Sequence, residues 1–361
     1  MKELFLLDPA VTFLNHGSFG ACPRPVFETY RHWQRELERE PVEFIARRLP
    51  DLLAEARASL AAYVGAHADD LTFVSNAGTG VNMAARALDL QPGDEVLATD
   101  LEYDALNFTW EWLCKRAGAT YVRAPWHELF EQVTERTRVL FVSHITSETG
   151  LLLPVQELVA HARRLGLVTI VDGAHAPAHV PLDVEAIGAD FYAGNCHKWL
   201  CAPKGAGFLW VRPEWQERID GAIVSWGYAA DANTFLSRTE LQGTRDPSAY
   251  LSVPSAIAFV RDYDDAQRCV ELAREARREL CALTGEEPIA AESMVQRMAS
   301  FRVPVDANEL QRRLWNEERI EIPAMRDDLM RISVAMYTDR EDVERLLAAL
   351  ARLLTVSRSP A

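Results

Sequence analysis

The middle of the chain alternates short runs of β-branched and aromatic residues with segments of helical periodicity. The runs predict strands at residues 70–76, 94–99, 119–125, 138–144, 168–175, 189–195 and 205–211. Helical patterns lie between them at residues 81–90, 104–118 and 154–166. The runs VLFVS and VTIVD are apolar throughout, which is typical of strands covered on both faces. The alternation predicts an α/β fold with right-handed crossovers and a mainly parallel, doubly wound sheet.

The pattern changes from about Pro254. A long helical run at residues 255–285 is followed by shorter strand-like pieces at 298–304 and 329–337. The last helix, at 339–354, begins with an aspartate cap and carries apolar residues at helical spacing. These elements predict a smaller α+β domain packed on the first.

We therefore expect three parts in the chain. Residues 1–25 form an N-terminal arm, residues 26–250 a large α/β domain, and residues 251–361 the small α+β domain. A charged helical segment at 31–63 connects the arm to the large domain. A length of 361 residues agrees with roughly two domains.

Composition narrows the class of partner. A hydrophobic fraction of 48% and a charged fraction of 25% are those of an ordinary globular protein. The net charge of -15 argues against nucleic acid and anionic membranes, which both require a basic face. No window reaches the ~18 apolar residues of a membrane span, and the apolar run at the N-terminus is too short for a signal peptide. Six cysteines without a CxxC pair disfavour a disulfide framework and a zinc site. A cytoplasmic protein is expected.

Lysine is rare in this sequence. Of the 38 basic residues only Lys2, Lys115, Lys198 and Lys204 are lysines. Any chemistry that needs a lysine amine therefore has four candidates.

Polar and aromatic residues follow five of the predicted strands. Because ligands of open α/β sheets bind at the carboxyl ends of strands, these residues are the candidates for a site. They are Asn76, Gly78 and Thr79; Asp100, Glu102 and Tyr103; His144 and Ser147; Asp172 and His175; and Asn195, His197 and Lys198.

The segment from Asn76 to Asn82 combines a strand end, a glycine-containing turn (AGTG) and the start of a helix. Free N–H groups at such a helix N-terminus bind anions. Neither GxGxxG nor a Walker A pattern is present, so no dinucleotide or nucleoside triphosphate site is indicated. A purely structural turn is the alternative at this point.

Asp172 ends a run of four apolar residues and is followed by small residues. An ionised carboxylate in that position is suited to holding a protonated nitrogen, whereas a solvated loop aspartate is the alternative. His175 and His179 have the spacing of a helical metal pair, but Pro177 lies between them and no carboxylate motif is near, so we expect no metal.

Lys198 lies 26 residues beyond Asp172, directly after the next strand. A lysine at the mouth of an apolar site has its pKa lowered by desolvation and becomes a usable amine. Lys204, in a Pro-Gly loop, is the second candidate. A phosphate-binding turn, a buried carboxylate, an aromatic residue and a lysine that can form a Schiff base are together what pyridoxal 5′-phosphate (PLP) requires.

The sequence resembles the fold-type I, class V PLP-dependent enzymes, and within them the isopenicillin N epimerase-like branch. The resemblance covers nearly the whole chain. It is carried by FLNHGSFGACP, VDGAHA, NCHKWLCAPKGAGF, QGTRDPSAYLSVPSAI and RISVAMYTDREDVERLL.

For the cofactor ring, the resemblance implies positions for five residues. Lys198 would bind the cofactor covalently, and Asp172 would pair with the pyridine nitrogen. His175 would lie near the phenolic oxygen. Tyr103 would stack on the ring, where many relatives have histidine, and Ser147 takes the place of an asparagine that the desulfurase branch has near the ring.

For the phosphate, the resemblance implies Gly78 and Thr79, with Asn195 and His197 helping. Relatives often carry a hydroxyl residue at the position of Gly78, so a backbone N–H would substitute and Thr79 would be the hydroxyl donor. Thr244 would reach a phosphate across a dimer interface, which implies a homodimer.

For the substrate, the resemblance implies an amino acid held by three residues. Arg331 matches the arginine that binds the α-carboxylate bidentately. Asn15 and His16 match the strip that lines the substrate side. Trp199 is expected to pack in the core.

The reaction stays open at this point. The segment RIEIPAMRDDLMRIS contains no cysteine, which disfavours desulfuration through a persulfide, and Cys196 and Cys201 are expected to be packing residues. Epimerisation, C–S β-elimination and transamination remain, with epimerisation ahead on similarity. Epimerisation requires a second acid/base group, for which Tyr103 and His16 are candidates. A PLP-fold protein without catalysis is the remote alternative.

Overall fold

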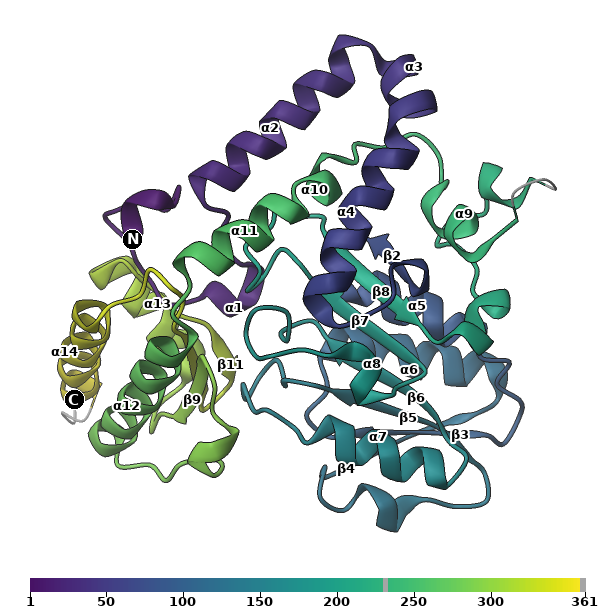
Figure 1. The fold of residues 1–361 in the computed structure, drawn as a ribbon. Helices are drawn as coiled ribbons and strands as arrows, with labels where there is room; N and C mark the ends of the chain where they lie inside the picture. Colours follow the sequence, from purple (N-terminus) through teal and green to yellow (C-terminus); the bar gives the residue numbers. More distant parts are fainter. Residues whose placement is uncertain (230–232, 358–361) are drawn as a thin grey trace.

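The structure is a computed structural model that describes residues 1–229 and 233–357. A seven-stranded sheet forms the centre of the larger part of the chain (Figure 1). Its strands, in the order in which they lie side by side, are β2 (Leu71–Val74), β8 (Gly207–Val211), β7 (Phe191–Asn195), β6 (Val168–Gly173), β5 (Thr137–Ser143), β3 (Glu95–Thr99) and β4 (Thr120–Ala124).

The five strands from β7 to β4 are parallel, and β8 runs antiparallel to both β7 and β2. The expected doubly wound, mainly parallel sheet is therefore confirmed, with the antiparallel pairing restricted to one side. The four residues of β2 and all five of β7 and β8 are buried. Continuous apolar strands of this kind need cover on both faces.

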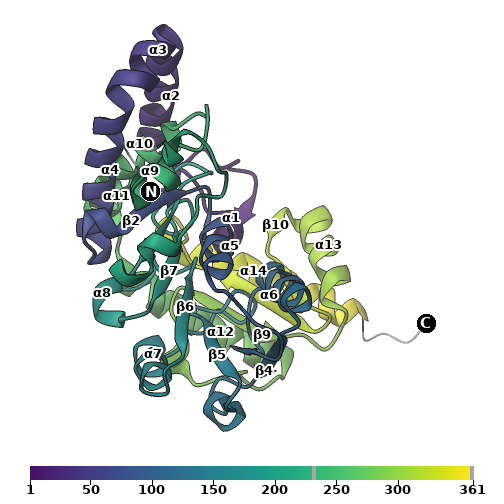
Figure 2. The same cartoon turned by 90° about the vertical axis from the view of Figure 1, so that its right-hand side faces the viewer.

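Helices supply that cover on the two faces (Figures 1 and 2). On one face, α5 (Ala77–Ala87) and α6 (Asp104–Ala117) share a core with the sheet around Trp110 and Phe141. The other face is covered by α4 (Leu49–Val64), α7 (Val155–Arg164), α8 (Val184–Ile187), α10 (Ser248–Leu251) and α11 (Val253–Tyr263).

One predicted turn is helical in the structure. The residues AGTG, expected as a turn, form the first turn of α5. The reason is the cap: the Asn76 side chain accepts a hydrogen bond from the Thr79 amide at 2.8 Å, which satisfies a free N–H of the first turn. The helix therefore begins directly at the strand end.

The C-terminal part forms a second unit with its own core. A three-stranded sheet has the order β11 (Ala324–Arg326), β12 (Leu329–Ser333), β9 (Met298–Arg302). The helices α12 (Ala266–Thr284), α13 (Ala307–Glu318) and α14 (Arg340–Ser357) belong to this unit. Alternate residues of β12, such as Met330 and Ile332, enter its core, so Leu329, Arg331 and Ser333 lie on the opposite face of the strand.

The expectation of one long helix over 255–285 was wrong. The run is divided into α11 and α12 at Asp264 and Asp265. Asp265 caps α12 by accepting from the Arg268 amide at 3.1 Å, and the Asp264 carboxylate is drawn into an ion pair with buried Arg297. Helical periodicity alone does not show such a break, because both aspartates fall on a polar stretch.

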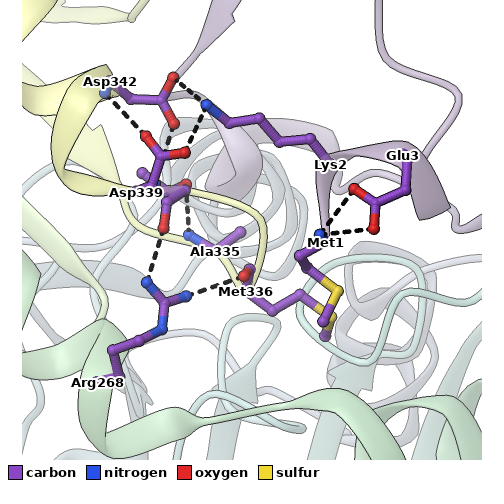
Figure 3. Close-up of polar contacts among 9 residues, drawn as sticks. Met1, Lys2, Glu3, Arg268, Ala335, Met336, Asp339 and Asp342 are labelled. Atoms are coloured by element: carbon purple, nitrogen blue, oxygen red, sulfur yellow. Dashed lines mark hydrogen bonds and ion pairs between the residues drawn. The ribbon is translucent and has the colours of Figure 1, made fainter.

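The N-terminal arm joins the C-terminal unit. Strand β1 (Thr12–Phe13) pairs in parallel with β10 (Ile320–Glu321), and Leu14 is buried in the core of that unit. Figure 3 shows Lys2 between Asp339 and Asp342, with Nζ–O distances of 2.9 Å to both carboxylates. These contacts fix the arm beside the segment that follows β12.

The described residues contain further helical segments. Figure 1 shows α2 rising from the arm and α4 returning toward the sheet. They are α1 (His16–Phe19), α2 (Arg24–Arg39), α3 (Pro41–Glu43) and α9 (Phe235–Glu240), a π-helical turn at Phe44–Arg48, and 3-10 turns at Lys2–Leu4, Ala68–Asp70, Leu129–Gln132, Pro213–Arg218, Trp226–Tyr228 and Glu292–Met294. Within residues 1–229 and 233–357, no helix is long and apolar enough to cross a membrane.

Candidate active site

The carboxyl ends of β5, β6 and β7 meet at one edge of the large sheet. Ser143 is in register with Asp172, and Asp172 with Ala193, so Asp172 lies at the centre of this edge. The carboxyl group is buried, and Oδ1 accepts the Ala174 amide at 2.9 Å. Burial raises the pKa of Asp172, while that amide and the charge of Lys198 oppose the shift.

Lys198 follows β7 at the same edge and is half-buried. Its Nζ lies 3.1 Å from Nε2 of His175. Desolvation lowers the pKa of the Lys198 amine to about 8, although the Asp172 carboxylate acts in the opposite direction. At neutral pH a usable fraction of the amine is therefore uncharged, which a nucleophilic amine requires.

Two histidines contact the lysine, His175 at its amine and His16 at its backbone oxygen. His175 is buried, and its Nδ1 lies 3.4 Å from the indole nitrogen of Trp199. His16 contacts the backbone oxygen of Lys198 through Nε2 at 3.1 Å and the Tyr337 hydroxyl through Nδ1 at 2.9 Å. Burial is the main reason why the pKa of His16 falls to about 3 and that of His175 lies well below the ordinary value.

His179 has a structural environment. Its Nδ1 lies 3.0 Å from the His175 backbone oxygen, and its Nε2 accepts the Arg297 amide at 2.8 Å. Both ring nitrogens are thus used within the protein. Across the described ranges, no group of three or more histidine, cysteine or acidic side chains has a metal-binding arrangement.

The start of α5 lies beside the same edge. Asn195, at the end of β7, accepts the Ala77 amide through Oδ1 at 2.8 Å. Asn195 thereby orients the first turn of the helix, while the Thr79 hydroxyl lies 2.8 Å from that of Ser75. His197 uses Nδ1 for a 2.8 Å contact with the Ala206 carbonyl, which leaves Nε2 available.

Arg331 comes from the C-terminal unit, on the face of β12 opposite that unit's core. It is 1% exposed, and its guanidinium donates to the Ser147 carbonyl and, at 3.4 Å, to the Ser18 hydroxyl. Its Nε has no hydrogen-bond partner, and among the described residues Arg331 forms no ion pair. The nearby carboxylate of Glu148 pairs with Arg326 at 2.5 Å instead. A buried guanidinium without an acid is available for an external carboxylate.

Asn15 is engaged with the protein on both sides of its amide. Its nitrogen donates to Glu321 at 2.9 Å, and its oxygen accepts from the Ser18 hydroxyl at 2.6 Å. Gly20 also brings the arm against Lys198: its φ is +70°, and a Cβ there would lie 2.0 Å from the His197 carbonyl oxygen. The arm is therefore part of the wall behind the lysine.

Two of the predicted residues are exposed and, in the described ranges, form no hydrogen bond with the residues around Lys198. Tyr103 is at the N-cap of α6 and is 49% exposed. Thr244 is exposed and lines a cavity of about 460 Å³ together with Trp226, Arg245 and Tyr250. None of the hydrogen bonds of the described part of the chain joins Thr244 to the Lys198 site.

Glu102 was one of the strand-end candidates without an assigned role, and the structure shows its environment. Glu102 is 2% exposed and accepts hydrogen bonds from the Thr99 hydroxyl at 2.5 Å and from the Ser143 amide at 3.1 Å. Burial raises the pKa of this carboxyl to about 7. A glutamate directly before Tyr103 at a strand end was the available signal, but its burial depends on the neighbouring strand.

The cysteines beside the lysine are packing residues, as expected. Cys196 and Cys201 are buried, and burial raises the pKa of both thiols. Trp199 is also buried, which confirms its predicted place in the core. None of these three side chains is exposed enough to act directly on a substrate.

Comparisons with known proteins agree with this arrangement. The family model described as aminotransferase class-V matches residues 23–346. Isopenicillin N epimerase from Amycolatopsis lactamdurans is 39% identical over 98% of this chain and 97% of that protein. The enzyme of the same name from Streptomyces clavuligerus is 37% identical over 96% of both chains. L-cysteine desulfhydrase from Arabidopsis thaliana is 28% identical over 95% of this chain and 88% of that protein.

A solved structure extends the similarity to the fold. A mutant of C-DES with glycine covalently linked to its PLP cofactor superposes with a TM-score of 0.88 at 25% identity, covering 97% of this chain and 99% of that one. The expected family, fold and cofactor are thus confirmed. The chain belongs to the class V aminotransferase family, whose members depend on PLP.

Proposed function

We propose that this protein is a PLP-dependent enzyme that removes and returns the α-proton of an amino acid, and thereby inverts the α-carbon. The observation that carries the proposal is the pairing of a half-buried amine of lowered pKa, Lys198, with a buried guanidinium that has no acid of its own, Arg331. The Lys198 amine is suited to proton transfer, and the Arg331 guanidinium is suited to binding an α-carboxylate.

The residues of the site fit the aldehyde, the ring nitrogen and the phosphate of PLP. Lys198 would hold the aldehyde carbon, and the buried Asp172 carboxylate would face the ring nitrogen. Gly78 and Thr79, in the first turn of the eleven-residue helix α5, and Nε2 of His197 would hold the phosphate. The Gly78 amide lies in the first turn of α5, where N–H groups have no acceptor within the helix, and no other backbone bond in the described ranges uses it, which leaves it for an anion.

When bound, PLP delocalises negative charge from the α-carbon of an attached amino acid. The residues of the chain orient the substrate and transfer the proton. Arg331 orients the substrate by its carboxylate, and Asp172 keeps the ring nitrogen protonated. Lys198 moves a proton at Nζ, and its lowered pKa matches this task near neutral pH.

The second acid/base group required for inversion is assigned to Tyr103. His16, the other candidate, uses both ring nitrogens for contacts with Lys198 and Tyr337 and is 1% exposed. Tyr103 is 49% exposed at the strand-end edge and can contact a ligand. Stacking on the ring and proton transfer are compatible roles for a tyrosine at this position.

C–S β-elimination is the second candidate. It requires only Lys198 and a leaving group on the substrate, and it is supported by the 28% identical desulfhydrase and by the similar structure of the cystine C–S lyase C-DES, with a TM-score of 0.83. The 37–39% identity to isopenicillin N epimerases places inversion first. Transamination is not favoured by any feature of the site.

The test uses purified holoprotein and a panel of L- and D-amino acids in deuterated water. Deuterium at the α-position with inverted configuration supports the proposal. Pyruvate and ammonia from S-substituted cysteines support elimination instead. Lys198→Ala should abolish the visible absorption band of the bound cofactor and all turnover, whereas Lys204→Ala, the matched lysine in the nearby loop, should keep both. Turnover in Lys198→Ala would refute the assignment.

The protein is further proposed to act as a cytoplasmic homodimer in which Thr244 completes the site of the partner. The 460 Å³ cavity that Thr244 lines is largely apolar, with Ile45, Leu49 and Leu53 on α4 and the preceding turn. An exposed apolar cavity of this kind is suited to contact with a second copy. Sedimentation should give a dimer, and Thr244→Ala should weaken PLP binding; a monomer with full PLP affinity would contradict the assignment.

A further inference from the structure

Trp199 is placed so that its only polar atom faces a residue of the site. The indole Nε1 lies 3.4 Å from Nδ1 of His175, with its hydrogen directed at that nitrogen. The side chain is 1% exposed and is held by the ring of His179, with centroids 4.2 Å apart, and by the Arg297 guanidinium 5.9 Å from its centroid. The indole has little freedom to turn.

This contact decides which nitrogen of His175 carries the hydrogen. An indole N–H can only donate, so Nδ1 of His175 must accept and must be bare. A neutral imidazole has a single N–H, which is then on Nε2. Burial keeps the ring neutral, because it lowers the pKa of His175 well below the ordinary value. The Nε2–H therefore faces Nζ of Lys198, 3.1 Å away.

We propose that Trp199 is a positioning residue that fixes His175 as the Nε2–H tautomer, so that His175 offers a permanent hydrogen-bond donor to the Lys198 nitrogen. This inference rests on the proposed function of Lys198 as the amine that binds the cofactor.

The fixed tautomer favours the uncharged form of Lys198. An Nε2–H can donate to the lone pair of a neutral amine, but it meets an ammonium as a second donor. The ammonium must then give up this contact, whereas a His175 free to change tautomer could accept from it. Trp199 thus acts with burial to keep Lys198 nucleophilic.

The other charged and titratable groups around His175 and Lys198 act in the same way on both tautomers of His175. Asp172 favours the charged form of Lys198, and Arg331 opposes it. His16 and His179 are buried and neutral, with their nitrogens engaged elsewhere. Arg297 lies beyond Trp199 and is paired with Asp264. Among these contacts, only the tautomer of His175 decides whether Nζ of Lys198 meets a hydrogen-bond donor or an acceptor.

The first test is the imidazole ¹⁵N spectrum of the protein without PLP, which needs no catalysis. The His175 signals are identified by their loss in His175→Ala. A bare Nδ1 and a protonated Nε2 are expected in the wild type, and a protonated Nδ1 would overturn the proposal. In Trp199→Phe, which keeps an aromatic ring and removes the N–H, the two tautomers should interconvert. If this variant does not fold, the wild-type spectrum alone decides.

The second test is the pH dependence of the rate at which PLP attaches covalently to the protein. In Trp199→Phe the midpoint should rise by about 0.5–1 unit, the size of one neutral hydrogen bond, so attachment at pH 7 slows by roughly three- to ten-fold. Trp110→Phe is the matched control, since Trp110 is buried in the core between α6 and the sheet and its N–H has no partner. An unchanged midpoint in Trp199→Phe would overturn the proposal.

A double variant separates tautomer control from packing. In His175→Ala, the additional Trp199→Phe change should not move the midpoint, because no imidazole is left to transmit it. An equal shift in both backgrounds would show that Trp199 acts by packing and would overturn the proposal. Failure of the proposed function gives a different result, namely no covalent attachment in any variant, while the ¹⁵N spectrum still reports the tautomer.

Discussion

Two buried arginines of this protein should respond in opposite ways to the same substitution. Arg331 and Arg297 are each 1% exposed. Arg297 is paired with the Asp264 carboxylate and lies over the Trp199 ring. Arg331 has no acid partner among the described residues, and burial lowers its pKa to about 10. If Arg331 is kept for a substrate carboxylate, its removal costs binding, whereas removal of Arg297 costs stability.

The magnitudes follow from these contacts. In its proposed role Arg331 would donate two charge-assisted hydrogen bonds to the substrate, each worth at least about 1.5 kcal/mol, so Arg331→Met should raise KM by roughly 10²-fold. The same change removes a desolvated charge, so the free energy of unfolding should stay within about 1 kcal/mol of the wild type or increase. Arg297→Met leaves the Asp264 carboxylate buried and unpaired, which costs about 3–5 kcal/mol.

Steady-state kinetics and urea unfolding of both variants check this reasoning. Arg331→Met should show an elevated KM, a nearly unchanged unfolding midpoint and a retained visible band. Arg297→Met should show a lowered midpoint and, where folded, a KM close to that of the wild type. The assignment of Arg331 fails if its KM is unchanged, or if its loss of stability equals that of Arg297→Met.

Three further predictions concern other parts of the site. Burial raises the pKa of Glu102 in the folded protein to about 7, so the stability that the protonated carboxyl contributes is complete below about pH 4.5 and is lost as the pH rises to 7. Urea unfolding of Glu102→Gln and of the wild type should therefore show the variant gaining about 3 kcal/mol in relative stability across this pH window. Gly20→Ala should abolish PLP binding, measured by absorbance titration, because the added Cβ would displace the His197 carbonyl. Gly205 also has a positive φ but lies in open space, so Gly205→Ala should bind PLP normally. Asp172→Asn should lower kcat by roughly 10²–10³-fold and keep the covalent attachment of PLP, and an unchanged kcat would exclude Asp172 as the partner of the ring nitrogen.

The sequence by itself determined the type of fold and the edge of the sheet at which Asp172 and Lys198 lie. Continuous apolar runs such as VLFVS are typical of strands covered on both faces, and their alternation with helical patterns predicted the doubly wound sheet. The positions of Asp172 and Lys198 followed as well, because the carboxyl ends of parallel strands share one edge. The rarity of lysine narrowed the choice of amine to four positions.

Only the tertiary structure decided which polar groups have partners. Local pattern alone does not separate Arg331 from Arg297, whereas the structure places the Asp264 carboxylate against Arg297 after α11 and α12 separate. The pairing of β1 with β10 joins residues some 300 positions apart, which no local pattern reports. The contact of Trp199 with His175 likewise joins two chain segments. Local periodicity records which face of an element is buried, whereas hydrogen-bond partners, protonation and tautomers depend on what is packed against that face.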